Sequence, residues 1–193
     1  MKNKNLIFGI ILIGLIATGG IWFLSLKKPE QKPPQPPQKT VNSFEECEAA
    51  GYPISESYPP KCTRLDGKSF TQDIGSELEK TDLIRVENPR PNQTITSPVV
   101  INGEARGTWF FEASFPIKLK DEKGNVIATT IAHAQDDWMT ENFVPFSATL
   151  EFQTTTQKGN LILEKDNPSG LPQNADELRI PVKIISTPSP SKE

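Results

Sequence analysis

The sequence predicts an all-β protein whose main domain is a β-sandwich of about seven strands. Three observations support this prediction. Apolar and polar residues alternate with a period of two from about residue 82 onward, turn-forming residues separate the alternating segments, and the same region lacks the 3.6-residue period of an amphipathic helix. The N-terminal part of the chain has a different composition in each of its segments.

The chain of 193 residues begins with an uncharged apolar segment of 21 residues, Leu6 to Leu26. At the helical rise of about 1.5 Å per residue, this length covers the hydrocarbon core of a bilayer, which is about 30 Å thick. Only five residues precede the segment. We therefore expect residues 1–28 to form a single-pass transmembrane anchor, with the N-terminus in the cytoplasm and the remainder outside it. A cleaved signal peptide is the alternative, with a poor cleavage site at Ala17 to Gly20.

Residues 29–41 are rich in proline and glutamine, and the final residues 187–193 are also polar and contain two prolines. Because proline fixes φ and lacks an N–H group, the first segment favours polyproline II and predicts a stiff linker. An SH3-type ligand is the alternative, which the expected location outside the cell disfavours. We expect the C-terminal segment to be disordered.

The two cysteines of the chain, Cys47 and Cys62, lie in a small motif at residues 42–75. An exported protein meets oxidising conditions, so we expect these cysteines to form a disulfide. Ser43 and Glu46 have the spacing of a capping box, and Gly51 has the position of a helix stop. The motif should therefore begin with a short helix.

The segment from Asp66 to Phe70 (DGKSF) resembles a turn of Kazal-type protease inhibitors. That family is built on three disulfides, whereas this segment can form one. Inhibition of a secreted protease is therefore our alternative function, and a disulfide-pinned spacer is the plainer interpretation. Redox chemistry is disfavoured, because the two cysteines do not form a Cys-x-x-Cys pair.

Residues 76–186 contain the alternating segments. The clearest runs from Phe111 to Lys120 and predicts one long strand, with Phe111, Phe115 and Leu119 on the buried face. Further strands are expected around Ile84, Val99, Asn125 to His133, Phe146, Leu161 and Ile180, with turns between them at Asn88-Pro-Arg-Pro91, Glu122 to Asn125, Lys158 to Asn160 and Asn167 to Gly170. This number and spacing of short strands favours an immunoglobulin-like sandwich.

Three blocks of this region carry a family resemblance: Thr96 to Ala128, Asp136 to Phe152 and Leu161 to Gly170. They resemble the immunoglobulin-like domain associated with bacterial spore-germination proteins of the GerM type. The resemblance implies an extracytoplasmic binding or structural domain at the bacterial cell envelope, without catalytic residues to transfer. It also implies a link to germination, although the chain lacks an accompanying germination domain.

The sequence predicts neither catalysis nor nucleic-acid binding. His133 is the only histidine, so one chain cannot build a histidine-based triad or a multi-histidine zinc site. Residues 76–193 contain 12 basic and 17 acidic residues, a balance that repels nucleic acid. We expect no enzyme activity and no cofactor. The expected partners are an envelope protein or a glycan, together with the membrane itself, and no pattern predicts an oligomeric state.

Two clusters remain as candidate sites. Asp136 and Asp137 are weak calcium candidates, since a Ca²⁺ ion needs six or more oxygens and these two residues supply only part of a site. The aromatic cluster comprises Trp109 and Phe110, with Trp138 and Met139 further along the chain. Because Phe111 has the buried parity, Phe110 and with it Trp109 should face outward, where they could contact a sugar or a protein partner. Burial of these aromatics in an edge-covering loop is the alternative.

Overall fold

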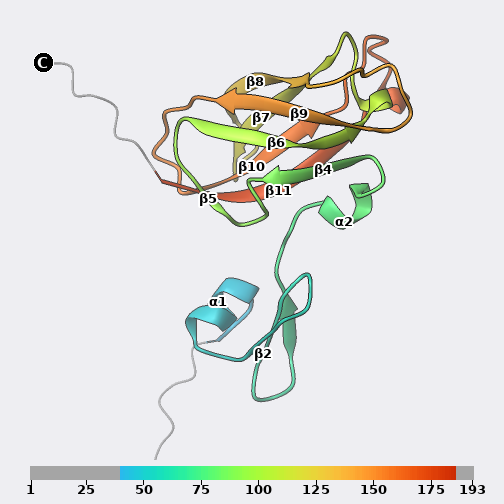
Figure 1. Cartoon of the computed structure of the whole chain (residues 1–193). Coiled ribbons are helices and arrows are strands. Elements are labelled where there is room, and N and C mark those ends of the chain that lie inside the picture. Colours follow the sequence, from blue (N-terminus) through green and yellow to red (C-terminus); the bar gives the residue numbers. More distant parts are fainter. Residues whose placement is uncertain (1–39, 186–193) are drawn as a thin grey trace, which may run out of the picture. The chain divides into compact units, whose positions relative to one another are not determined.

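The structure, a computed structural model, describes residues 40–185 (Figure 1). The expected transmembrane anchor, the linker up to residue 39 and the C-terminal tail lie outside this range. Among the described residues, no helix is both long enough and apolar enough to cross a membrane.

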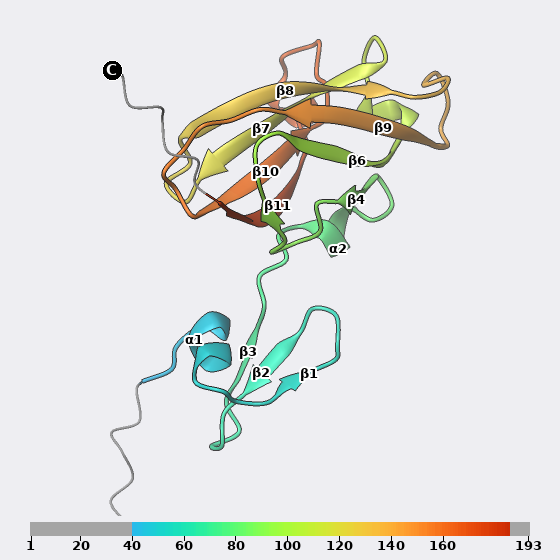
Figure 2. The ribbon, with the colours of Figure 1, turned by 60° about the vertical axis from the view of Figure 1, so that its left-hand side comes forward.

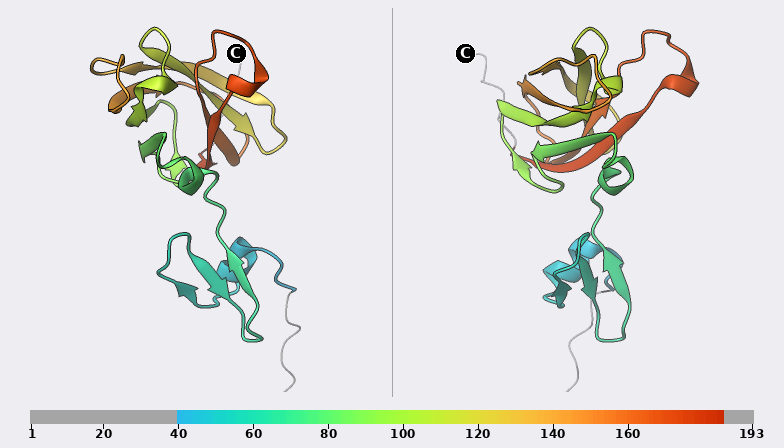
Figure 3. Two further views of the ribbon diagram at one scale, coloured as in Figure 1. Left: turned by 90° about the vertical axis from the view of Figure 1, so that its right-hand side faces the viewer. Right: turned by 45° about the vertical axis from the view of Figure 1, so that its right-hand side comes forward.

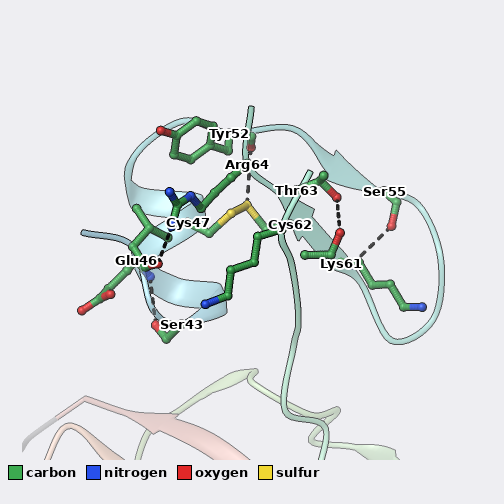
Figure 4. Close-up of a disulfide and its surroundings, with 12 residues drawn as sticks. Ser43, Glu46, Cys47, Tyr52, Ser55, Lys61, Cys62, Thr63 and Arg64 are labelled. Carbon is green, nitrogen blue, oxygen red and sulfur yellow. Dashed lines mark hydrogen bonds between the residues drawn. A yellow bond between two sulfur atoms is a disulfide. The ribbon is translucent and has the colours of Figure 1, made fainter. Parts of the chain in front are cut away.

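The cysteine motif consists of one short helix and a three-stranded antiparallel sheet. Its elements are α1 (Phe44–Ala49), β1 (Ile54–Ser55), β2 (Lys61–Thr63) and β3 (Ser69–Thr71), in the sheet order β1-β2-β3. The predicted disulfide is present: Cys47 and Cys62 are bonded, with their Cα atoms 6.0 Å apart, and it joins α1 to β2 (Figure 4). Both cysteines are fully buried and pack with Val41 and Phe44. The disulfide therefore occupies much of a very small core.

Both ends of α1 confirm the predicted helix signals. The Ser43 side chain accepts a hydrogen bond from the Glu46 backbone N–H at 3.1 Å, which satisfies one of the free N–H groups of the first turn. The Glu46 carboxylate in turn accepts from the Asn42 backbone N–H at 2.7 Å. After the helix, Gly51 takes a φ of 76°, a conformation that favours glycine.

The remaining strands form one continuous set in the order β4-β6-β9-β8-β7-β10-β11-β5. Neighbours are antiparallel except β11 and β5, which are parallel. The strands are β4 (Ile84–Asn88), β5 (Thr94–Ile95), β6 (Val99–Arg106), β7 (Ser114–Asp121), β8 (Val126–Ala134), β9 (Phe143–Leu150), β10 (Lys158–Glu164) and β11 (Glu177–Ile184). The structure thus confirms the predicted β-sandwich and adds the two-residue strand β5.

This set of strands folds over into two facing layers, with β6 and β9 in one and β7, β10 and β11 in the other (Figure 2). The alternation on each strand puts every second side chain between the layers. Phe115 of β7 meets Phe146 of β9 edge to face, with ring centroids 5.0 Å apart. Ile101, Leu161 and Ile180 complete the centre and are fully buried.

The predicted long strand begins at Ser114 and not at Phe111. The expectation that Phe111 lies on the buried face is therefore wrong. Glu112 and Ala113 have φ values of 49° and 59°, so the chain turns sharply before β7 begins at Ser114. Phe111 pairs back with Ser114 across this turn. The alternation that buries Phe115 therefore does not extend back to Phe111, which is 40% exposed.

The segment before the first sandwich strand is held against β11. Asp73 forms two hydrogen bonds with the Arg179 guanidinium, at 2.7 and 3.0 Å, and these hold the pKa of Asp73 below its usual value. Gly75 adopts a φ of 75° close to the Arg179 backbone. The helix α2 (Glu77–Lys80) follows, and its buried Glu77 is neutralised by an ion pair with Arg90.

Candidate functional site: the three-loop end of the sandwich

Three loops meet at one end of the sandwich, and we call this surface the three-loop end. They are residues 107–113 between β6 and β7, residues 135–142 between β8 and β9, and residues 165–176 between β10 and β11. The strand register requires this grouping, because β6 pairs with β9 at Arg106 and Phe143, β7 with β8 at Ser114 and His133, and β7 with β10 at Ile117 and Leu163. In the right-hand view of Figure 3 the loop 165–176, drawn in orange to red, extends from the same end as the other two. Immunoglobulin variable domains also carry their binding loops at one end.

Backbone hydrogen bonds connect the first loop to both of the others. The Gly107 N–H donates to the Asn142 carbonyl at 3.1 Å, and the Asp166 N–H donates to the Trp109 carbonyl at 3.0 Å. The Ala134 N–H donates to the Ala113 carbonyl at 2.9 Å, at the base of the second loop. These bonds make the loops one connected surface. A bound partner would therefore meet loops that are already held in place, which lowers the entropy cost of binding.

The predicted aromatic cluster lies at this end, but two of its members point into the protein. Trp109 is 1% exposed and Phe110 4%, and both belong to the main core. Phe110 packs edge to face against Phe115, with ring centroids 5.2 Å apart. The expectation that Phe110 and Trp109 face outward is therefore wrong, because both side chains are buried. The cause is the turn at Glu112 and Ala113, which reverses the parity on which that expectation depended.

Each of the three loops presents one large apolar side chain to solvent. These residues are Phe111 at 40% exposure, Met139 at 77% and Leu171 at 48%. Met139 was predicted as a contact residue, whereas Phe111 and Leu171 were not. The neighbouring Trp138, also predicted as a contact residue, is half-buried and packs against the core. An isolated leucine in a polar loop, as in Asn167 to Asn174, is the sequence signal that could have identified Leu171.

The three-loop end is strongly acidic. Its loops contain one basic residue, Lys165, and six acidic residues, namely Glu112, Asp136, Asp137, Glu141, Asp166 and Asp176. Asp136 accepts from the Asp137 N–H at 2.7 Å, and Asp137 accepts from the Met139 N–H at 3.0 Å. Each of these two carboxylates uses one oxygen to shape the loop. The other oxygen of each makes no hydrogen bond among the described residues.

A hollow of about 650 Å³ adjoins the third loop, and it is also lined by carboxylates. Glu164 and Asp176 on its wall form salt bridges with Lys118 and Lys80, at 2.7 and 2.6 Å. Asp166 and Glu177 line the same hollow, and neither forms a salt bridge within residues 40–185. Lys165 also lines the hollow, without a salt bridge in the described segment, so that four carboxylates stand against Lys165 and the two salt-bridged lysines. The hollow therefore keeps a small excess of negative charge.

The structure adds no further ligand to the calcium site suggested for Asp136 and Asp137 among the described residues. Residues 40–185 contain no group of three or more ligating side chains that could hold a metal ion. Asp121, a further acidic residue, lies at the opposite end of β7 from this loop. Hydrogen bonds from the Asn125 side chain and from the N–H groups of the turn lower the pKa of Asp121, so its carboxylate stabilises the β7–β8 turn.

Substitutions of the buried Trp109 should have different effects on the stability of the protein. The indole Nε1–H group of Trp109 is buried and has no hydrogen-bond acceptor among the described residues. An unsatisfied buried donor costs about 1–3 kcal/mol, and Trp109→Phe removes this donor but keeps most of the ring. We expect Trp109→Phe to remain within about 1 kcal/mol of the wild type, whereas Trp109→Ala should lose about 3–5 kcal/mol by leaving a cavity.

Urea denaturation of the two Trp109 variants measures this difference. Equal losses for Phe and Ala would show that the indole makes a polar contact that the structure does not contain.

Comparison with known proteins identifies the same region. Residues 83–170 match the family model described as the immunoglobulin-like domain of bacterial spore germination. The match spans β4 to β10 and includes the first two loops and part of the third. It confirms the resemblance drawn from the sequence. No curated protein and no solved structure matches the chain.

Proposed function

We propose that this chain, whose residues 83–170 carry the immunoglobulin-like domain of bacterial spore germination, is a non-catalytic binding protein of the bacterial cell envelope. The three-loop end is its contact surface. One observation carries the proposal: three loops that are joined by backbone hydrogen bonds each expose one large apolar side chain. Several exposed apolar groups on hydrogen-bonded loops at one end of a domain are typical of interaction sites.

The N-terminal sequence supports a location outside the cytoplasm. The apolar segment Leu6 to Leu26 is long enough to anchor the chain in the membrane, and the proline-rich residues 29–39 would extend the folded part away from it. The disulfide between Cys47 and Cys62 is consistent with an oxidising compartment. A role connected with germination agrees with the description of the matched family.

Site-specific cross-linking in intact cells tests the proposed contact surface. A photo-reactive amino acid replaces Met139 or Leu171 in the full-length chain. Val126 is the matched control, because it is 54% exposed and follows the β7–β8 turn at the opposite end of the sandwich. We expect an envelope component to be captured from positions 139 and 171, and at least tenfold less from position 126. Equal capture from all three positions, or none, would refute the assignment.

Loss of the exposed apolar side chains should weaken capture without unfolding the protein. We expect Phe111→Ser, Met139→Ser and Leu171→Ser each to reduce affinity for the captured component by about tenfold, the cost of a moderate interface contact. Val126→Ser serves as the control and should leave the affinity unchanged. Quantitative pull-down with purified full-length variants measures the effect, and wild-type affinity in all three loop variants would contradict it.

Inhibition of a secreted protease is the second candidate. The observation that favours it is Leu65, which is 82% exposed between β2 and β3, three residues after the disulfide-bonded Cys62. An inhibitor should slow at least one secreted protease at micromolar concentration, and Leu65→Gly should abolish the effect. A broad protease panel without any slowing would eliminate this candidate.

A further inference from the structure

We infer that the partner of the three-loop end is a protein segment in which lysine or arginine side chains flank an apolar centre. The inference rests on the proposed function and adds the chemical class of the partner. Three features of the surface carry it: the exposed apolar side chains, the excess of carboxylates in the loops, and the acidic hollow beside the third loop.

The apolar side chains define the centre of the contact. Met139 and Leu171 are flexible or branched aliphatic groups, and Phe111 is the one exposed aromatic ring at this end. A sugar ligand typically stacks on aromatic faces, whereas aliphatic side chains gain most from burial against other apolar side chains. The composition of this surface therefore favours a protein partner over a glycan.

The carboxylates define the rim of the contact. Six acidic residues against one basic residue give the three loops a negative field, which attracts basic groups and speeds their association. The same field repels anionic lipid headgroups and anionic glycans. Because Asp136 and Asp137 are exposed and each has an oxygen without a partner among the described residues, they can accept hydrogen bonds from a cationic side chain.

The hollow beside the third loop supplies a place for one such cation. Its wall contains four carboxylates and one lysine, Lys165. Two of the carboxylates already bind other lysines of this chain, whereas Asp166 and Glu177 lack salt bridges within the described segment. A lysine or arginine from the partner would complete this arrangement. Its aliphatic stem could lie along Pro116 and Ala175, which line the same hollow.

Binding of synthetic peptides to the immobilised full-length chain tests the inference. The first probe is a 15-residue peptide with a Leu-Phe-Leu centre and three lysines on each side. The second replaces the lysines by glutamates, and the third keeps the lysines but replaces the centre by Ser-Ser-Ser. We expect the first peptide to bind at least tenfold more tightly than either of the others. Its affinity should fall by about tenfold between 50 mM and 500 mM salt.

Matched variants separate specific binding from general attraction of a basic peptide. The double variant Asp136→Asn/Asp137→Asn keeps the loop hydrogen bonds but removes two charges. The double variant Asp166→Asn/Glu177→Gln removes two charges from the hollow. We expect each pair to weaken the first peptide about fivefold to tenfold. Glu122→Gln with Glu151→Gln removes two exposed charges from loops at the other end of the sandwich and should change binding less than twofold.

The peptide-binding and cross-linking results together test whether the partner is a basic, apolar protein segment. Equal weakening by both kinds of variant, or equal binding of the lysine and glutamate peptides, would overturn it. If cross-linking from position 139 instead captures a glycan or an acidic protein, the partner class is wrong while the three-loop end remains a binding surface. If no component is captured from any loop position, the proposed function itself fails.

Discussion

Replacing Gly107 with alanine should destabilise the sandwich by about 3 kcal/mol, because a Cβ atom at this position has no room. It would lie 1.9 Å from the Thr140 carbonyl oxygen and 2.3 Å from the Trp138 carbonyl oxygen. Both obstacles are backbone atoms, which cannot rotate away. The second loop would have to move, and the hydrogen bond from the Gly107 N–H to the Asn142 carbonyl would be lost or lengthened.

Urea denaturation of Gly107→Ala measures the loss of stability, and the peptide-binding assay measures its consequence at the three-loop end. Gly124→Ala is the control, because Gly124 has open space around its Cα atom but a φ of 86°. It should lose only about 1 kcal/mol, the cost of holding alanine in the left-handed region. A Gly107→Ala protein as stable as the wild type would show that the first two loops are not packed as described.

Removing the disulfide should unfold the cysteine motif and leave the sandwich intact. A disulfide that closes a loop of about 15 residues contributes about 3 kcal/mol in the chain-entropy model. The motif has little else to replace it, since its other fully buried apolar residues are Val41 and Phe44. The sandwich has its own core of 23 buried residues that does not include either cysteine.

Hydrogen exchange of Cys47→Ser/Cys62→Ser separates the two parts of the chain. We expect the amides of α1 and β2 to exchange at least a hundredfold faster, while those of β6 and β9 keep their protection. Cys47→Ala/Cys62→Ala is the control for the burial of two hydroxyl groups, and it should show the same loss of protection. Protection of α1 in both variants would mean that the motif has another source of stability.

Local sequence patterns were sufficient for much of this structure. Alternation of apolar and polar residues located the strands around Ile84, Ile101, Phe146, Leu161 and Ile180, because each strand buries one face against the same core. The helix signals at Ser43 and Gly51 were also correct, since capping depends on residues only a few positions apart. The cysteine pairing followed from there being two cysteines in the chain.

The surface chemistry of the three-loop end depended on tertiary structure. The positive φ values of Glu112 and Ala113 reverse the parity before β7, so that Phe110 is buried and Phe111 is exposed, and no periodic pattern contains that information. Leu171 and Met139 lie at the same end of the sandwich only because the strand register brings loops distant in sequence there. Patterns with periods of 2 and 3.6 report which face of an element is buried, whereas a binding surface is formed by loops whose relative positions are determined by pairing between distant strands.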